Sequence, residues 1–415
     1  MRNPGFLWII FGIMLLLDIY IFQAVKYVLP TGSPRLRLTI IVVYWAFAVF
    51  LLGLLVLFPF LNYESWPKQF RTYLFALLVA AFFSKLVASL FFAADDIRRG
   101  ATWLLVKLFR GAVNDVNEAG SGISRSAFLS WLGIAFGGGL FSTFVYGFSN
   151  KYKYTVRHIN IAFKNLPSSF RGLKIVQISD VHSGSFNNRE AVKRGIDKIM
   201  NEKPDMILFT GDLVNDKAVE MEDYKDLFSE LKAPMGVYSV LGNHDYGDYV
   251  RWESAEVKNA NLESLKEVQR SMGWKLLMNE NVVFNRNNEQ IALLGIENWS
   301  AKGNFPKYGK LSDAYRGAEN IPFKILMSHD PSHWEAEVKE KYRDINLMLS
   351  GHTHGMQFGV EIPGLKWSPV QYMYKQWAGL YGEDEQRLYI NRGFGFIGYP
   401  GRVGILPEIS VITLT

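Results

Sequence analysis

The sequence contains no cysteine. Disulfide bonds and thiolate metal ligands are therefore excluded, and any metal site must use nitrogen and oxygen donors. Of the 45 Lys+Arg and 39 Asp+Glu residues, 12 and 6 lie in residues 1–150, which leaves 33 of each sign in residues 151–415. The excess positive charge thus belongs to the N-terminal part, where basic residues flank apolar runs, and it does not indicate nucleic-acid binding.

Long apolar runs occupy the first 150 residues. A bilayer core is crossed by about 20 helical residues, and four runs are long enough: Phe6–Leu29, Leu38–Leu61, Thr72–Ala94 and Phe128–Phe148. We therefore expect a transmembrane region over residues 1–150 and a separate domain over residues 151–415. The segment Ile97–Phe109 mixes basic and apolar residues, which is typical either of an interfacial helix or of a continuation of the third span.

Two ionisable residues lie inside these runs, Asp18 in the first and Lys85 in the third. The first and third spans run in the same direction, so that the two charges lie at similar depth. A lone charge inside a bilayer is costly, which favours a buried pair. In the alternative, Lys85 extends to the membrane surface, and Asp18 is protonated or contacts a polar neighbour.

Basic residues are distributed unequally among the connecting loops. The loops after the first and third runs, counted together with Lys26 at the end of the first run, hold eight Lys+Arg, whereas the N-terminus and the loop after the second run hold three. The positive-inside rule then places the N-terminus outside, and four crossings place the C-terminal domain outside as well. We therefore expect a multi-pass protein of the cytoplasmic membrane with an extracytoplasmic domain.

From residue 153 onward, short β-branched runs alternate with helical patterns, and Tyr154–Phe163 alternates like an edge strand. The predicted buried strands are Leu173–Ser179, Met206–Thr210, Val237–Leu241, Phe323–Met327 and Ile345–Leu349. The predicted helices are Arg189–Asn201, Tyr224–Lys232, Leu262–Met272 and Ser332–Lys341. Later strands are predicted at Val282–Phe284, Gln290–Leu294, Gln386–Ile390 and Ile409–Leu414. This alternation predicts an α/β domain whose sheet is largely parallel, with mixed or antiparallel additions.

Five short motifs follow the predicted strands and contain five of the seven histidines. They are Asp180-Val181-His182, Gly211-Asp212, Gly242-Asn243-His244-Asp245, Ser328-His329-Asp330 and Gly351-His352-Thr353-His354. Ligand sites of open α/β sheets gather at the carboxyl ends of strands, so that residues far apart in the chain can converge there. Carboxylate, imidazole and amide donors converging at one edge indicate a site for two divalent metal ions.

At each of these blocks the chain resembles the calcineurin-like metallophosphoesterase family, whose DxH, GD, GNH(D/E), isolated His and GHxH blocks occur here in order. The resemblance covers roughly residues 154–415 and implies an α-β-β-α sandwich of two mixed sheets. Asn165-Leu166-Pro167 and Asn391-Arg392-Gly393 are similar to the membrane-anchored bacterial branch of that family. One departure is Gly295-Ile296-Glu297-Asn298, where many relatives carry an aspartate.

The resemblance also implies roles for individual residues. The implied ligands are Asp180, His182, Asp212 and His354 for one metal, and Asp212 as bridge with Asn243, His329 and His352 for the other. His244 would protonate the leaving alkoxide, oriented by Asp245, while a metal-bridging hydroxide attacks phosphorus in line. The implied cofactors are two divalent ions drawn from Mn, Fe, Zn or Co.

Three further features have more ordinary explanations. His158 and His333 are expected to be surface or core residues. The segment 393–398 matches a dinucleotide fingerprint, but Pro400 and Gly401 follow it in place of a helix, so we expect a glycine-rich loop near the site instead. Arg402 either contacts an anionic substrate or is a solvated arginine.

An aromatic segment follows the last motif: Trp367, Tyr372, Tyr374, Trp377 and Tyr381. These residues are typical of core packing or of a hairpin. Alternatively they form a wall beside the metals that contacts membrane or an acyl chain, because aromatic rings with polar tips suit an interface.

Together these features predict a membrane-anchored two-metal phosphohydrolase that cleaves a phosphoester or pyrophosphate bond. Its expected substrate is a phosphorylated small molecule or a lipid or envelope intermediate, its expected partner is the lipid bilayer, and no nucleic acid is expected. The alternative is a membrane sensor whose phosphoesterase-like domain binds a phospholigand without turnover. The complete ligand set and His244 favour the enzyme.

Overall fold

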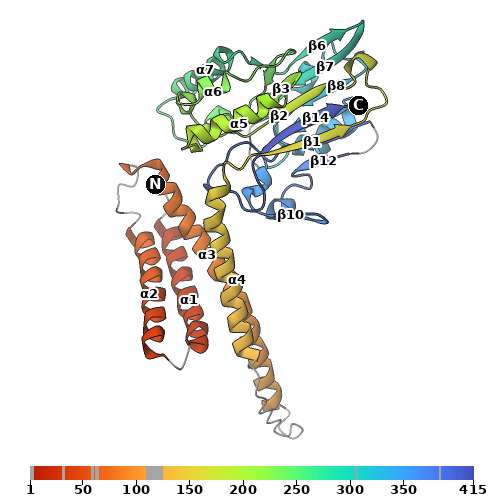
Figure 1. Cartoon of the computed structure of the whole chain (residues 1–415). Coiled ribbons are helices and arrows are strands. Elements are labelled where there is room, and N and C mark those ends of the chain that lie inside the picture. The colour runs from red at the N-terminus through yellow and green to blue at the C-terminus, as the bar shows by residue number, and fades with distance from the viewer. Residues whose placement is uncertain are drawn as a thin grey trace. The chain divides into compact units, whose positions relative to one another are not determined.

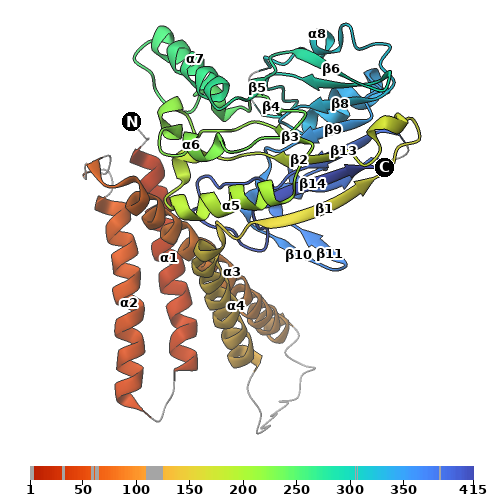
Figure 2. The ribbon, with the colours of Figure 1, turned by 45° about the horizontal axis from the view of Figure 1, so that its top comes forward.

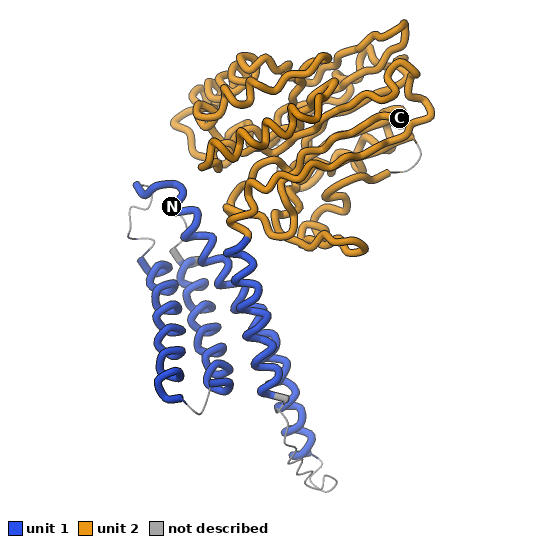
Figure 3. The backbone as a smooth tube through the Cα atoms, in the orientation of Figure 1, with its two compact units in different colours: residues 1–146 blue, residues 147–415 orange. Residues whose placement is uncertain are grey.

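The computed structural model describes residues 4–29, 33–57, 60, 65–108, 125–303, 305, 307–382 and 385–415. The chain divides into two compact units, Met1–Tyr146 and Gly147–Thr415 (Figures 1 and 3).

Long helices make up the described part of the first unit: α1 (Pro4–Val28), α2 (Pro34–Leu57), α3 (Lys68–Leu108) and α4 (Arg125–Gly147). Among the described residues, all four are long and apolar enough to cross a membrane, as predicted. The helix α3 continues without interruption to Leu108, so the segment after residue 97 extends the third span and is not a separate interfacial helix. The predicted ends Leu61 and Phe109 lie outside the described residues.

The predicted charge pair inside the first unit is confirmed. Lys85 Nζ lies 2.7 Å from Asp18 Oδ1, and the two side chains are 11% and 0% exposed. The Tyr44 hydroxyl donates a hydrogen bond to the Asp18 backbone carbonyl at 2.7 Å and lies 3.3 Å from Oδ1. The pair therefore joins α1 to α3, and Tyr44 adds α2 to the same polar cluster.

Breaking this pair from one side should destabilise the first unit. Lys85→Met leaves the Asp18 carboxylate without its cation, a change that costs about 3–5 kcal/mol for a buried pair. We expect a lower melting temperature of the full chain in detergent micelles, and recovery of most of the loss in the double variant Asp18→Leu/Lys85→Met. Equal melting temperatures for the single and double variants would contradict this account.

Two six-stranded sheets form the second unit (Figure 2). The first has the order β1 (Thr155–Ile161), β14 (Glu408–Leu414), β2 (Lys174–Ile178), β3 (Met206–Phe209), β4 (Val237–Ser239) and β5 (Lys275–Leu276). The second has the order β12 (Gly379–Tyr381), β13 (Arg387–Ile390), β9 (Leu347–Ser350), β8 (Lys324–Met327), β7 (Glu289–Gly295) and β6 (Glu280–Arg286). A separate hairpin is made by β10 (Val360–Ile362) and β11 (Leu365–Trp367).

Both sheets are mixed. In the first sheet β2 to β5 run parallel, and β14 pairs antiparallel with β2 and parallel with the edge strand β1. In the second sheet β7, β8, β9 and β13 run parallel, with β6 and β12 antiparallel at the two edges. The parallel strands β3, β8 and β9 are each four residues long and fully buried, as expected for strands covered on both faces.

Helices cover the outer face of each sheet. They are α5 (Arg189–Asn201), α6 (Lys225–Phe228) and α7 (Ala255–Ser271) on the first sheet, and α8 (Leu311–Tyr315), the π-helical turn Trp334–Val338 and α9 (Lys339–Lys341) on the second. Between the sheets, Ile175 and Leu208 belong to the same buried cluster as Ile325 and Leu349. The predicted α-β-β-α sandwich is confirmed.

Single turns of 3₁₀ helix complete the second unit: Phe148–Asn150, Ser168–Phe170, Ser183–Ser185, Ala218–Met221, His244–Tyr246, His354–Gln357 and Pro369–Tyr372. The predicted helix Tyr224–Lys232 is shorter than expected. After Phe228 the Glu230 N–H donates to the Leu227 carbonyl and the Leu231 N–H donates to the Phe228 carbonyl. These i to i−3 hydrogen bonds are those of a tighter 3₁₀ turn, so the α-helix ends at Phe228. The strands β5, β10, β11 and β12 were not predicted, because two or three residues carry too little periodicity.

Candidate metal centre

The five motifs meet at the carboxyl edge of both sheets. Asp180 follows β2, Asp212 follows β3, Asn243 follows β4, His329 follows β8 and His352 follows β9. Because β2 to β4 belong to one sheet and β8 and β9 to the other, each sheet supplies half of the site. This is the convergence that the strand pattern predicted.

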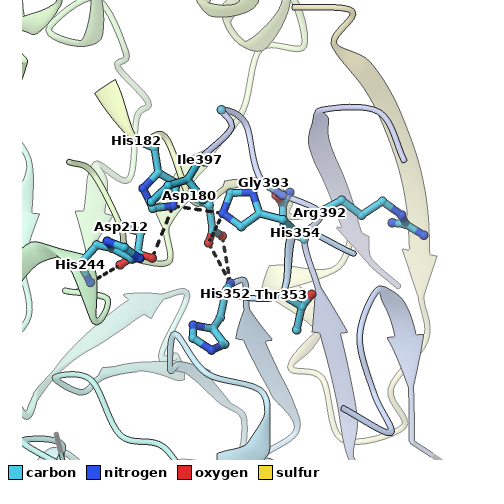
Figure 4. Close-up of polar contacts among 12 residues, drawn as sticks. Asp180, His182, Asp212, His244, His352, Thr353, His354, Arg392, Gly393 and Ile397 are labelled. Atoms are coloured by element: carbon cyan, nitrogen blue, oxygen red, sulfur yellow. Dashed lines mark hydrogen bonds and ion pairs between the residues drawn. The ribbon is translucent and has the colours of Figure 1, made fainter. Parts of the chain in front are cut away.

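The side chains form two adjacent groups that could each hold a metal ion. One group is Asp180, His182 and His354, and the other is Asp212, His329 and His352, with the ligand atoms of each group within 4.8 Å of one another. Figure 4 shows the first group beside Asp212.

Short distances link these ligand atoms. His354 Nε2 lies 3.2 Å from Asp180 Oδ1, and His182 Nε2 lies 3.0 Å from His354 Nε2. Asp212 Oδ2 lies 3.2 Å from His329 Nε2 and 3.6 Å from His182 Nε2. The Asp212 carboxylate is thus in contact with side chains of both groups.

Asn243 joins the second group. Its Oδ1 atom lies 2.8 Å from His352 Nδ1, which in turn lies 3.3 Å from His329 Nε2. The Asn243 amide nitrogen donates to the Tyr249 hydroxyl at 2.7 Å, which turns the oxygen toward the histidines. The structure therefore brings all seven predicted ligand residues together.

The ionisation of the site suits cation binding. Burial lowers the pKa values of His182, His352 and His354, so that these rings are neutral and offer a lone pair. Burial also opposes a charge on His329, but the Asp212 carboxylate outweighs it and raises the pKa of His329 to about 10. A metal ion at this position replaces the proton, so its affinity falls as the pH falls. Buried nitrogen and oxygen donors fit divalent ions of the Mn to Zn series.

The backbone at the ligands is strained. Positive φ angles occur at Asp180 (53°), His182 (48°), Asp212 (61°), His352 (71°) and His354 (49°). Such left-handed conformations in residues other than glycine are sparsely populated and gather at functional sites. The sharp turns aim consecutive side chains back toward one point.

Two motif glycines allow the close approach of the loops. A Cβ atom at Gly242 would lie 2.2 Å from Asp212 Oδ1, and one at Gly351 would lie 2.2 Å from Asp180 Oδ2. Any side chain at either position would displace a carboxylate of the site. The glycines of the GNH and GHxH blocks are therefore required by packing against the ligands.

His244 lies beside the ligands on the wall of the cavity. Its backbone N–H donates to Asp212 Oδ1 at 2.8 Å, and its Nδ1 lies 2.8 Å from the Asn215 carbonyl oxygen. The ring stacks near Tyr249, with centroids 4.4 Å apart. Because the carbonyl accepts from Nδ1, the Nε2 atom is the one left to face the cavity.

The prediction that Asp245 orients His244 is wrong. The Asp245 carboxylate is fully buried and accepts the backbone N–H groups of Asp212 (2.9 Å), Leu213 (2.8 Å) and Gly242 (2.9 Å). Burial and the nearby Asp212 charge raise the pKa of Asp245 to about 7. Asp245 thus holds the GD and GNH loops together, and the Asn215 carbonyl, which no motif signals, orients His244.

Both predictions for Arg402 are also wrong, because its side chain is 0% exposed. Its Nη1 donates to the Arg392 carbonyl at 2.7 Å, while Nη2 donates to the carbonyls of Gly393 and Gly395 and lies 3.2 Å from His354 Nδ1. Arg402 therefore ties the glycine-rich loop to a ligand histidine and is not available to substrate or solvent.

A cavity of about 240 Å³ opens onto these residues and is lined by His182, Asp212, Asn243, His244, Tyr249, Phe305, His352, His354 and Ile397. Tyr249 and Phe305 were not predicted, since they lie in loops without a recognisable pattern, whereas Ile397 lies in the glycine-rich segment 393–398 that was expected near the site. A larger hollow of about 510 Å³ near Lys266 and Trp274 is lined by none of the ligand residues. We therefore assign the chemistry to the smaller cavity.

The remaining predicted features divide between core, surface and site. His158 is exposed beside Glu202, and His333 is buried against Ser328 Oγ, as expected for ordinary residues. The glycine-rich loop lies at the site, with the Gly395 N–H donating to the Asp180 carbonyl at 2.9 Å. In the aromatic segment Tyr374 is buried with its hydroxyl 2.9 Å from His352 Nε2.

Removing the Arg402 guanidinium should loosen the metal centre. Arg402→Met removes the guanidinium donor from four carbonyls, those of His354, Arg392, Gly393 and Gly395, and Arg402→Lys does not restore the planar fork that reaches them. We expect a lower melting temperature and reduced metal content of the full chain in both variants, measured by thermal unfolding and elemental analysis. Arg316→Met, at an arginine side chain that is 79% exposed, is the control. Unchanged metal content in Arg402→Met would contradict this role.

Comparison with known proteins agrees with the geometry. Residues 1–151 match the family model described as "Probable Calcineurin-like phosphoesterase, transmembrane domain", and residues 173–356 match that of the calcineurin-like phosphoesterases.

Three relatives illustrate the match. A Danio rerio transmembrane protein with metallophosphoesterase domain is 30% identical over 263 residues, which cover 62% of this chain and 56% of that protein. The metallophosphoesterase YkuE of Bacillus subtilis is 31% identical, covering 60% of this chain and 81% of that one. The phosphodiesterase YaeI of Escherichia coli is 30% identical, covering 62% and 87%. The chain thus spans little more than half of the Danio relative. It belongs to the calcineurin-like phosphoesterase family, as a membrane protein whose C-terminal unit is a metal-dependent phosphoesterase domain.

Proposed function

We propose that this protein is a membrane-anchored phosphohydrolase that uses two divalent metal ions to cleave a phosphoester or phosphoanhydride bond. The observation that carries the proposal is the pair of adjacent, buried ligand groups that open, together with His244, onto one cavity. A domain that only bound a phosphate group would need neither a second ligand group nor an imidazole on the cavity wall.

The proposed ligands follow the two groups. They are Asp180, His182, Asp212 and His354 for the first ion, and Asp212, Asn243, His329 and His352 for the second. Asp212 is the proposed bridge because its Oδ2 atom contacts a histidine of each group. The nitrogen and oxygen donors suit Mn, Fe, Zn or Co.

Two such ions, when bound, supply positive charge against the phosphate oxygens and acidify water for in-line attack on phosphorus. His244 supplies the proton for the leaving oxygen, since its Nε2 faces the cavity while the Asn215 carbonyl holds Nδ1. The hydrogen bond from the His244 backbone N–H to the Asp212 carboxylate fixes the position of His244 relative to the proposed bridging ligand.

The first unit is proposed to anchor this reaction at a membrane. We propose that residues 1–150 cross the cytoplasmic membrane four times and that residues 151–415 lie on its outer side, as the distribution of basic residues among the loops favours. The proposed substrates are phosphorylated small molecules or lipids of the envelope, and no nucleic acid is expected, because residues 151–415 carry no net charge.

Loss of the His244 imidazole tests the proposed reaction. His244→Ala should lower kcat by about 10²–10⁴, the usual contribution of a general acid, with both metals retained. The full chain in detergent, loaded with Mn²⁺, would be assayed on a panel of phosphate monoesters, diesters and pyrophosphates, with metal content measured in parallel. His158→Ala, at an exposed histidine, is the control. Loss of metal in His244→Ala would refute the division of roles, and absence of hydrolysis by the unmodified chain would favour a phospholigand sensor.

Loss of the Asp212 carboxylate tests the proposed bridge. Asp212→Ala removes the oxygen that contacts both ligand groups, so we expect both metals to be lost and hydrolysis to disappear. Elemental analysis of the purified variant measures the metal content. The control is Asp313→Ala, at a carboxylate that forms only a surface ion pair. Retention of one metal per chain would show that Asp212 serves a single ion.

A further inference from the structure

The β10–β11 hairpin exposes its apolar face. The pairs Val360–Trp367 and Ile362–Leu365 lie on one side of the two-stranded ribbon, because residues two apart along a strand share a face. Val360, Ile362 and Leu365 are 39%, 58% and 51% exposed. This face therefore presents branched aliphatic side chains to the surroundings of the domain.

The opposite face of the hairpin is charged and turned toward the domain. Glu361 accepts hydrogen bonds from Arg157 at 2.7 Å and from Arg392 at 2.5 Å. Lys366 donates to the Ala378 carbonyl, with its Nζ atom 4.8 Å from the centre of the Trp377 ring. A hairpin adapted to water packs its apolar face against the domain, because removing apolar surface from water is favourable. The reversed orientation here is stabilised by the ion pairs and leaves the apolar face without a cover among the described residues.

The neighbouring turn extends this apolar surface. Tyr372 and Met373, in and after the 3₁₀ turn Pro369–Tyr372, are 79% and 58% exposed. The Trp367 indole N–H lies 3.5 Å from the Tyr372 hydroxyl, which links the turn to the hairpin. We call Val360, Ile362, Leu365, Tyr372 and Met373 the apolar patch.

Backbone bonds connect the root of the hairpin to the end of a candidate membrane span. The span Ser126–Asn150 includes Gly147, whose carbonyl accepts from the Arg402 N–H at 2.9 Å. The next residue, Val403, donates to the Gln357 carbonyl at 2.8 Å and accepts from the Gly359 N–H at 2.9 Å. The loop residues Arg402 and Val403 are thus hydrogen-bonded both to Gly147, in the last turn of the span, and to Gly359, which precedes the hairpin. Because Gly147 also belongs to the candidate span, the root of the hairpin is bonded through this loop to the residues at which the chain leaves that span.

The apolar patch also adjoins the metal centre. Met373 precedes Tyr374, whose hydroxyl lies 2.9 Å from Nε2 of the ligand His352. The patch is thus one residue along the chain from a side chain that contacts a proposed metal ligand.

We propose that the apolar patch inserts into the adjoining lipid leaflet and that the substrate is a phosphorylated lipid taken directly from that leaflet. The insertion stands on the orientation of the hairpin and on the bonds of Arg402 to Gly147 and of Val403 to Gly359. The substrate class rests on the proposed phosphohydrolase function. Branched aliphatic residues that enter the acyl region with tyrosine and tryptophan at the headgroup level are the arrangement expected of a membrane-docking element.

The absence of cysteine allows a direct test of insertion. The full chain carrying Ile362→Cys, labelled with an environment-sensitive fluorophore, would be reconstituted into vesicles of phosphatidylethanolamine and phosphatidylglycerol. We expect blue-shifted emission that is quenched by lipids with nitroxide-labelled acyl chains and protected from aqueous iodide. Val257→Cys, on α7 at 42% exposure, is the matched control and should be quenched by iodide. Equal iodide quenching at both positions would overturn the insertion.

Kinetics test the substrate class separately. The double variant Ile362→Asp/Leu365→Asp should raise KM for phospholipid in vesicles by about tenfold or more, since a carboxylate opposes the burial of this face in the acyl region. KM and kcat for a soluble chromogenic phosphodiester should not change. Val219→Asp/Val257→Asp, at exposed residues outside the patch, is the control pair. Equal KM values on vesicles would overturn the lipid substrate. Absence of hydrolysis on either substrate by the unmodified chain would refute the proposed function instead, while the fluorescence result still decides insertion.

Discussion

The organisation of the C-terminal unit depends on the burial of the Asp212 carboxylate between histidines of two ligand groups. Its oxygens contact His182 and His329 and accept the His244 backbone N–H. Its own N–H is held by the buried Asp245 carboxylate. Buried carboxylates require compensating positive charge, and the raised pKa of His329 shows how strongly the Asp212 carboxylate attracts it. The proposed divalent ions would supply that charge.

The backbone around the ligand cluster adopts strained and closely packed conformations. Ligand residues adopt left-handed conformations at the strand ends, and two glycines bring neighbouring loops within contact of the carboxylates. The Arg402 guanidinium donates hydrogen bonds to the carbonyls of Arg392, Gly393 and Gly395. It also lies beside the ring of His354. The loop that carries Arg402 also bonds through its backbone to Gly147, at the end of a candidate membrane span, and to Gly359, at the root of the β10–β11 hairpin.

Much of this could be predicted because it depends on local pattern. Apolar runs of sufficient length predicted the four helices of the first unit, and the buried strands were recognisable from short apolar runs between turn and helix patterns. The ligand motifs were recognisable because each follows such a strand, where parallel topology forces convergence. The pairing of Asp18 with Lys85 followed from their equal depth in two parallel spans and from the high cost of a lone charge in a bilayer.

Residue roles that depend on side-chain direction were decided only by the tertiary structure. Asp245 adjoins His244 in the chain, yet its carboxylate turns toward the backbone of another loop, and the carbonyl of Asn215 orients the histidine. Arg402 has the charge of a substrate ligand, but packing places it beneath the site. The reversed hairpin has an ordinary alternating sequence, which specifies two faces without specifying which one meets the protein. The sequence by itself determined which atoms can bind metal and where the chain can cross a membrane. The tertiary structure decided which groups face the cavity, because orientation depends on neighbours that are distant in the chain.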